Sequence, residues 1–168
     1  MPTESLAQGL LLPELRLLKA RDTSGSGVME LTVEKTSTME VCPRCATPSA
    51  SVYDRRNARV RDSNIRHRRV FLLIRKRRFS CKRCGKPFTE PVQGVRKGAR
   101  TSERFRRDVQ MACDNYADLK RVMTTFRCSS GYVYDTHYSV LELRRRTRLY
   151  PWPAAIGLDE HFFKANRY

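Results

Sequence analysis

Four cysteines in the middle of the chain have the residue type and spacing that point most directly to chemistry. They form two Cys-x-x-Cys pairs, Cys42–Cys45 and Cys81–Cys84, separated by thirty-five residues. Each pair can bend into a knuckle that presents two sulfurs at one point, and four thiolates suit a tetrahedral zinc ion. We therefore predict a structural Zn²⁺ site whose ligands are Cys42, Cys45, Cys81 and Cys84. The gap exceeds the roughly 15–20 residues typical of such sites, so the hairpin joining the knuckles must be long or carry an excursion.

A thiol–disulfide enzyme is the alternative interpretation of the two pairs. Redox-active pairs usually accompany a βαβ pattern, which this sequence lacks. The chain begins Met1-Pro2-Thr3-Glu4, with an acid where a signal peptide needs positive charge, so we expect a cytoplasmic protein in which disulfides are rare. Cys113 and Cys128 lie in helix-like segments without a partner motif, and we predict ordinary thiols there instead of metal ligands.

Positive charge dominates the composition. The chain has 34 Lys and Arg against 17 Asp and Glu, a net charge of +17, and twenty of the cations lie between Arg55 and Arg107. Such an excess predicts a polyanionic partner, most often nucleic acid, and we expect double-stranded DNA. No segment approaches the roughly 18 consecutive apolar residues of a membrane-spanning helix. The predicted phosphate contacts of this basic segment are Arg55, Arg56, Arg59, Arg61, Arg75, Arg77 and Arg78.

Strand-like segments precede and connect the cysteine pairs. Leu15–Lys19 and Val28–Val33 are separated by a spacer rich in Ser, Gly and Asp, which predicts a hairpin. Arg69–Phe79 contains a run of β-branched, aromatic and aliphatic residues that favours a strand, and it leads directly to the second knuckle. We predict a β-hairpin over residues 1–41 that packs on a zinc ribbon over residues 42–92.

The pattern becomes helical after Gly98. Apolar residues recur at helical spacing after Ser102, again after Asp118, and once more after the Ser129–Gly131 break. Three short helices with a tight break before the last predict a helix-turn-helix DNA-binding domain over residues 99–148, with a plain helical bundle as the alternative. The third helix would place its early residues at base edges and its last arginines on the DNA backbone. These residues are Tyr132, Asp135, Thr136, Ser139, Arg144, Arg145 and Arg146.

Several of these motifs together resemble a known family. Cys42–Cys45, Tyr53–Arg56, Arg59–Asp62 and Arg77–Cys81 resemble the zinc ribbon of bacterial insertion-sequence transposases of the ISL-three type. The helical region looks like the helix-turn-helix of that family, and the resemblance extends from about Leu11 to the end of the chain. It implies a cytoplasmic, nucleoid-associated protein of a mobile element that binds terminal inverted repeats for DNA transposition. A homodimer in the DNA complex is an option that it leaves open.

The end of the chain resembles the start of a catalytic domain. Ile156–Glu160 is similar to the strand that carries the first acid of the RNase H-like DDE domain, and Asp159 matches that acid. The family's chemistry needs three carboxylates that hold two divalent metals, usually Mg²⁺. The second Asp and the final Glu would lie beyond Tyr168, so Mg²⁺ would bind only in a complete catalytic domain. The resemblance therefore implies an amino-terminal transposase fragment that is catalytically incomplete as given.

The expected fold class is α+β with several modules. An N-terminal hairpin and a four-cysteine zinc ribbon precede a three-helix helix-turn-helix, and residues 149–168 form a linker and the first strand of a truncated RNase H-like domain. The alternative function is a stand-alone transcriptional regulator built from the same zinc ribbon and helix-turn-helix. A regulator would have no need of the strand around Ile156.

Overall fold

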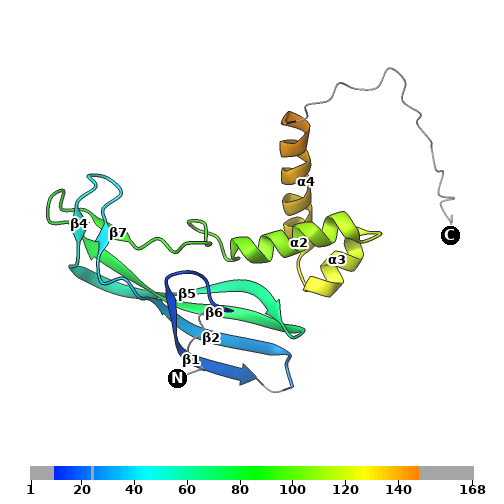
Figure 1. Ribbon diagram of the computed structural model, residues 1–168, viewed down its shortest axis with the longest axis horizontal. Coiled ribbons are helices and arrows are strands. Elements are labelled where there is room, and N and C mark those ends of the chain that lie inside the picture. Colours follow the sequence, from blue (N-terminus) through cyan, green and yellow to red (C-terminus); the bar gives the residue numbers. More distant parts are fainter. Residues whose placement is uncertain (1–9, 24, 148–168) are drawn as a thin grey trace, which may run out of the picture.

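The computed structural model describes residues 10–23 and 25–147, and it places a twisted sheet before a group of three helices (Figure 1). The strands are β1 (Leu15–Thr23), β2 (Val28–Lys35), β3 (Glu40–Val41), β4 (Pro48–Ser49), β5 (Val52–Ile65), β6 (Arg68–Ser80) and β7 (Pro87–Thr89). The helices are α2 (Glu103–Asn115), α3 (Leu119–Phe126) and α4 (Ser130–Arg146). The mixed α+β composition, with strands first and helices after them, is confirmed.

The main sheet has the order β1-β2-β6-β5, with β7 added to β6 beyond the end of β2. The predicted N-terminal hairpin is the antiparallel pair β1–β2. Its second strand runs parallel to β6, with Val28 opposite Arg69 and Val33 opposite Ile74. The hairpin and the strand that leads to the second knuckle therefore share one hydrogen-bonded sheet.

A long hairpin spans the gap between the cysteine pairs. Strands β5 and β6 have 14 and 13 residues and pair in antiparallel fashion along most of their length. Arg66 and His67 form the two-residue turn, with φ angles of 49° and 63°. Two successive left-handed residues give a turn whose twist matches that of the strands it joins. Of the two alternatives expected for this gap, a long hairpin or an excursion, the structure has the long hairpin.

The two faces of the sheet differ. Val70, Leu72 and Ile74 alternate along β6 and are fully buried, packing with Leu12 and Val92 from segments that cover this face. We call the other side the open face, and define it by the alternating residues of β5 and β6 that it displays. These are Asn57, Arg59, Arg61, Arg69, Phe71, Leu73 and Arg75.

Helices α2, α3 and α4 each begin at a side-chain cap. Ser102 accepts a hydrogen bond from the Phe105 N–H, Asp118 from the Arg121 N–H, and Ser129 from the Tyr132 N–H. Such caps satisfy one of the N–H groups that a helix leaves free at its start. The helices enclose a core of buried side chains. Its members are Phe105, Val109, Ala112, Cys113, Val122 and Val133.

A buried carboxylate fastens the helices to the sheet. Asp62 of β5 has no exposed surface and accepts hydrogen bonds from Ser102 Oγ and Arg104 Nε, both at 2.6 Å. The backbone adds two bonds, since Arg61 N–H donates to the Arg100 carbonyl and Ser102 N–H donates to the Arg61 carbonyl, each at 2.8 Å. The residue that caps α2 is thus also bound to the sheet.

Candidate metal centre and nucleic-acid interface

The two Cys-x-x-Cys pairs form the same turn twice. The Cys42 carbonyl accepts a hydrogen bond from the Ala46 N–H, and the Cys81 carbonyl accepts one from the Gly85 N–H, both at 2.9 Å. Ala46 and Gly85 both have left-handed backbones, with φ of 55° and 65°. The N–H of Cys42 donates to the Thr47 carbonyl, and the corresponding N–H of the second turn donates five residues ahead in the same way. This repeated geometry makes two knuckles that present their sulfurs side by side.

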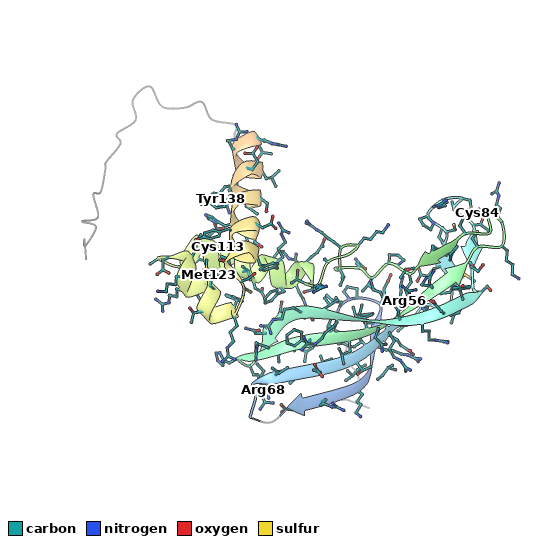
Figure 2. The ribbon with its side chains drawn as sticks, turned by 180° about the vertical axis from the view of Figure 1, so that it is seen from behind. Arg56, Arg68, Cys84, Cys113, Met123 and Tyr138 are labelled. Atoms are coloured by element: carbon teal, nitrogen blue, oxygen red, sulfur yellow. The ribbon has the colours of Figure 1, made fainter. Side chains whose placement is uncertain are left out.

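The four sulfurs come together at one end of the sheet. All four Sγ atoms lie within 4.8 Å of one another, with Cys42–Cys84 at 3.8 Å and Cys45–Cys81 at 3.5 Å across the two knuckles. Zinc–sulfur bonds of about 2.3 Å in a tetrahedron place sulfurs about 3.8 Å apart. The cluster therefore has the donor set and the size for a zinc ion. Figure 2 shows Cys84 at the end of the molecule remote from the helices.

The thiols differ in acidity. The side chain and backbone of Thr47 lower the pKa of Cys45 to about 6. A backbone hydrogen bond with Lys86 lowers the pKa of Cys84, but burial and the three neighbouring sulfurs outweigh it and raise the pKa to about 11. The neighbouring sulfurs thus favour the thiolate of Cys45, whose pKa they also lower, and oppose that of Cys84. A coordinated cation would favour the thiolate form of all four.

Little apolar material supports the knuckles. Phe79 and Phe88 stack with ring centroids 5.8 Å apart beneath the cysteines, and Val52 packs beside them. Apart from these side chains, the cluster consists of the four cysteines themselves. A metal ion would therefore supply cohesion that this small core lacks.

Comparison with protein families identifies the cysteine segment. Residues 39–84 match the family described as the zinc-finger of transposase IS204/IS1001/IS1096/IS1165. This segment is similar to the zinc ribbon of ISL-three-type transposases. It contains all four cysteines and ends before the helices begin. No curated protein and no solved structure matches the chain.

Arg77 was predicted to contact phosphate, but it is structural. Its guanidinium donates to Glu90 Oε2 from Nε at 2.9 Å and from Nη2 at 2.7 Å, and Nη2 also donates to the Ser37 carbonyl at 2.6 Å. The Glu90 side chain is fully buried, and only 16% of the Arg77 side chain is exposed. The pair joins β6 to the segments beside the knuckles, so this prediction is corrected.

Arg61 is also buried, with 9% of the residue exposed. Its guanidinium lies 4.9 Å from the centre of the Phe105 ring and 5.2 Å from that of Phe71, and Nη2 donates to Asn64 Oδ1 at 2.7 Å. It sits where the open face meets α2, and the exposed Arg59 lies over the same Phe71 ring. Arg61 cannot belong to a broad exposed phosphate-contacting surface.

The other predicted arginines of β5 and β6 remain accessible to different degrees. Arg55 and Arg75 are exposed and form no ion pair within the described part of the chain. Arg59 lies 3.5 Å over the Phe71 ring and 3.3 Å from Glu30 Oε1. The remaining two share one carboxylate on the strand pair. Arg78 lies 2.8 Å and Arg56 3.8 Å from Asp54 Oδ2.

The predicted contact residues at the start of α4 separate into two groups. Thr136 has no exposed surface, and the Tyr132 ring stacks on Phe105 at 6.1 Å, so both face the helical core. We therefore no longer place Tyr132 and Thr136 among the base contacts, which corrects the prediction. Helical periodicity puts both residues beside the buried Val133. Asp135 and Ser139 are exposed.

Arg144, Arg145 and Arg146 are exposed, but each has a carboxylate partner. Arg144 binds Asp114 of α2 through two hydrogen bonds at 2.7 and 3.1 Å, and this contact lowers the pKa of Asp114. The other two share Glu142, whose pKa they lower to about 2. To contact DNA phosphates, these arginines would therefore have to release their carboxylate partners.

A basic groove beside the first knuckle was not predicted. It has a volume of about 680 Å³ and lies between the first knuckle, β6–β7 and the segment that follows β7. Its lining includes the cations Arg44, Lys76, Arg78 and Lys97. Arg44 lies inside the first Cys-x-x-Cys motif, and this sequence feature was not used to predict the surface.

Asp159, the proposed first catalytic acid, lies outside the described residues, as does the strand predicted around it. Within residues 10–23 and 25–147, no helix combines the length and apolar character needed to cross a membrane.

Proposed function

We propose that this chain is the amino-terminal region of a transposase and binds the terminal inverted repeats of an insertion sequence as double-stranded DNA. The observation that carries the proposal is the four-sulfur cluster within a segment that matches a transposase zinc ribbon. A surplus of positive charge on the same chain supports a DNA partner, because phosphates dominate the affinity of proteins for DNA. A homodimer in that complex stays a prediction.

The ribbon would act as a rigid platform. A structural Zn²⁺ held by Cys42, Cys45, Cys81 and Cys84 would fix both knuckles, since metal binding supplies folding energy in such small modules. The exposed cations that surround it would then meet the DNA backbone from fixed positions. These are Arg44, Lys82, Arg83 and Lys86 at the knuckles, with Arg55, Arg56 and Arg75 on the hairpin.

Helices α3 and α4 would act as a helix-turn-helix. Arg127 ends α3 in a left-handed conformation with φ of 48°, and Ser129 already caps α4, so the connection is as tight as that motif requires. We place α4 in the major groove, with Asp135, Ser139 and Tyr138 as its exposed candidates for base contacts. Arg144–Arg146 would contact the backbone near its end.

Any catalysis would depend on residues outside the described part. Asp159 is the proposed first carboxylate of an RNase H-like site that would hold Mg²⁺ with two further carboxylates, and the Mg²⁺ would activate the attacking oxygen and stabilise the leaving one. The zinc ribbon and the helices would position DNA for that site.

Fluorescence anisotropy with a labelled duplex of the element's terminal repeat tests the DNA-binding function. We expect tighter binding to this duplex than to a scrambled duplex of equal length. If about six phosphates are contacted, the logarithm of the association constant should fall with the logarithm of salt concentration with a slope of about −5. A slope near zero, or equal affinity for both duplexes, would contradict the proposal.

A further inference from the structure

A cleft lies where the open face of the sheet meets the turn between α3 and α4. It has a volume of about 270 Å³, and the sheet, the residues that precede α2, and the α3–α4 turn all contribute to its walls. Three arginines line it: Arg61 and Arg69 from the sheet and Arg127 from the turn. None of the described residues that line it is acidic. The cleft thus concentrates positive charge without an internal counter-charge.

Two donor groups in this cleft are buried and unused. Arg61 Nη1 and Arg69 Nε have no hydrogen-bond partner among the residues that the structure describes. Burying a polar group without a partner costs free energy, and the cost is larger when the group is charged. Arg61 is nine-tenths buried, and this burial lowers its pKa to about 10; Arg69 and Arg59 lower it further, and Cys128 and Asp62 act in the opposite direction. An anion in the cleft would lie beside Arg61 and Arg69 and offset the repulsion between them.

The start of α4 adds to this positive field. Ser129, the cap of this 17-residue helix, lines the cleft. The first N–H groups of a helix have no partner within it, and they carry the positive end of the helix dipole. Helix starts commonly bind phosphate groups for this reason.

We propose that this cleft holds one phosphate of the DNA backbone, gripped by Arg61 and Arg69 on one wall and by Arg127 on the other. The inference rests on the proposed function, because its ligand is part of the DNA. If α4 lies in the major groove with its first residues at the bases, the flanking backbone passes the start of the helix. The clamped phosphate would fix the orientation of the helices and of the sheet on the same duplex.

The salt dependence of DNA binding tests the cleft. Arg69→Gln and Arg127→Gln are measured in the full chain with the terminal-repeat duplex, beside the control Arg68→Gln. The Arg68→Gln substitution removes the same charge from the position next to Arg69, where the Arg68 guanidinium binds Asp22 of β1. Losing one phosphate contact should reduce the magnitude of the salt slope by about 0.9 and weaken binding about eightfold at 0.1 M salt. The control should keep the wild-type slope.

A second measurement separates this inference from the proposed function. Thermal melts in sodium phosphate and in sodium chloride of equal ionic strength should show that phosphate stabilises the wild type more than Arg69→Gln. Circular dichroism and zinc content verify that each variant is folded, and Arg127→Gln carries the test if Arg69→Gln is not, because Arg127 is exposed on a turn.

The outcomes are distinct. If the wild type binds DNA but both cleft variants keep its slope, the cleft inference is overturned and the proposed function stands. If the wild type does not bind DNA, both are overturned. A phosphate effect that persists in that case would assign the cleft to a free anion instead of the DNA backbone. Reduced slopes in both cleft variants, with an unchanged control, support the proposal.

Discussion

The ribbon end and the helical end of this molecule are each stabilised by a different kind of core. At the ribbon end, the buried cluster contains two phenylalanines and one valine beside the four cysteines, Cys42, Cys45, Cys81 and Cys84. At the helical end, three short helices enclose an apolar core that includes Phe105, Val122 and Val133. The first depends on a few residues at one point and the second on a periodic pattern along three helices. This difference is the reason that we expect a metal ion to stabilise the ribbon end.

Two long strands, which contribute Val52 and Phe79 to the ribbon end, join it to the helical end. The long β5–β6 hairpin runs from the knuckles to the helices, where Asp62 binds Ser102 and Arg104. In Figure 2, Cys84 and Cys113 mark the two ends. Because the two buried clusters share no residue, damage to one can be measured separately from damage to the other.

The largest expected effect is the loss of the ribbon end in Cys81→Ser. Zinc contributes on the order of 10–16 kcal/mol of apparent binding free energy in small zinc modules at neutral pH, so this variant should lose zinc and unfold the knuckles. Helical circular dichroism should persist. Cys113→Ser, in the helical core, is the control and should retain about one zinc per chain. An unchanged thermal melt and full zinc content in Cys81→Ser would contradict the metal centre.

Phe105→Ala should damage the opposite end. Phe105 is 1% exposed and contacts the rings of Phe126 and Tyr132 in the helical core. Its truncation should lower the free energy of unfolding by about 3–5 kcal/mol, through lost burial and the cavity left behind. The helical signal should melt earlier while zinc content stays unchanged, and Phe105→Leu should cost less. Concurrent loss of zinc would show that the two ends unfold as one unit.

The equivalence of the two knuckles can be tested by exchanging the residue types at their left-handed positions, with a smaller expected change in stability. Ala46 adopts a left-handed backbone that costs an L-residue free energy, whereas the equivalent position of the second knuckle is Gly85. Ala46→Gly should stabilise the zinc-loaded protein by about 0.5–1 kcal/mol, because the relieved strain exceeds the added entropy of the unfolded chain. Gly85→Ala should have the opposite effect, since an added Cβ there meets no atom within 4 Å and only the backbone strain remains. Chemical denaturation of both variants measures the change, and equal signs would contradict the equivalence of the knuckles.

The smallest expected effect on stability comes from the ion pairs on the surface of α4. Hydrogen bonds from Arg145 and Arg146 lower the pKa of Glu142 from 4.5 to about 2. A lowered carboxyl pKa stabilises the folded state above about pH 4.5, and this contribution disappears as the pH falls toward 2. Carboxyl NMR titration should give the low value, and Arg145→Gln should raise it. A wild-type value near 4.5 would show that these exposed pairs add nothing at the helical end.

Local features were predictable from the sequence. The paired cysteines, the apolar run of β6 and the caps at Ser102, Asp118 and Ser129 are short-range signals, and the structure contains the corresponding elements. Each depends on residues within a few positions of one another, so no tertiary information is needed to find them. The parallel pairing of β2 with β6 joins distant segments and had no comparable signal.

The burial of individual side chains is what the sequence could not predict. Arg55 and Arg77 belong to the same basic segment and lie opposite each other on β5 and β6, yet one is exposed and the other is bound to the buried Glu90. Composition predicts that such a segment is basic, but it cannot say which cations meet an internal carboxylate. The same holds for Thr136, whose burial depends on how α4 packs against α2 and α3.

By itself, the sequence determined the paired cysteines, the surplus of positive charge, and the order of strands before helices. Those properties depend on residue type and near-neighbour spacing. Only the tertiary structure decided that Asp62 joins the sheet to the helices and that Arg61, Arg69 and Arg127 share one cleft. These groups come from separate segments, and their contacts exist only because packing of the sheet and the helices brings them within reach of one another.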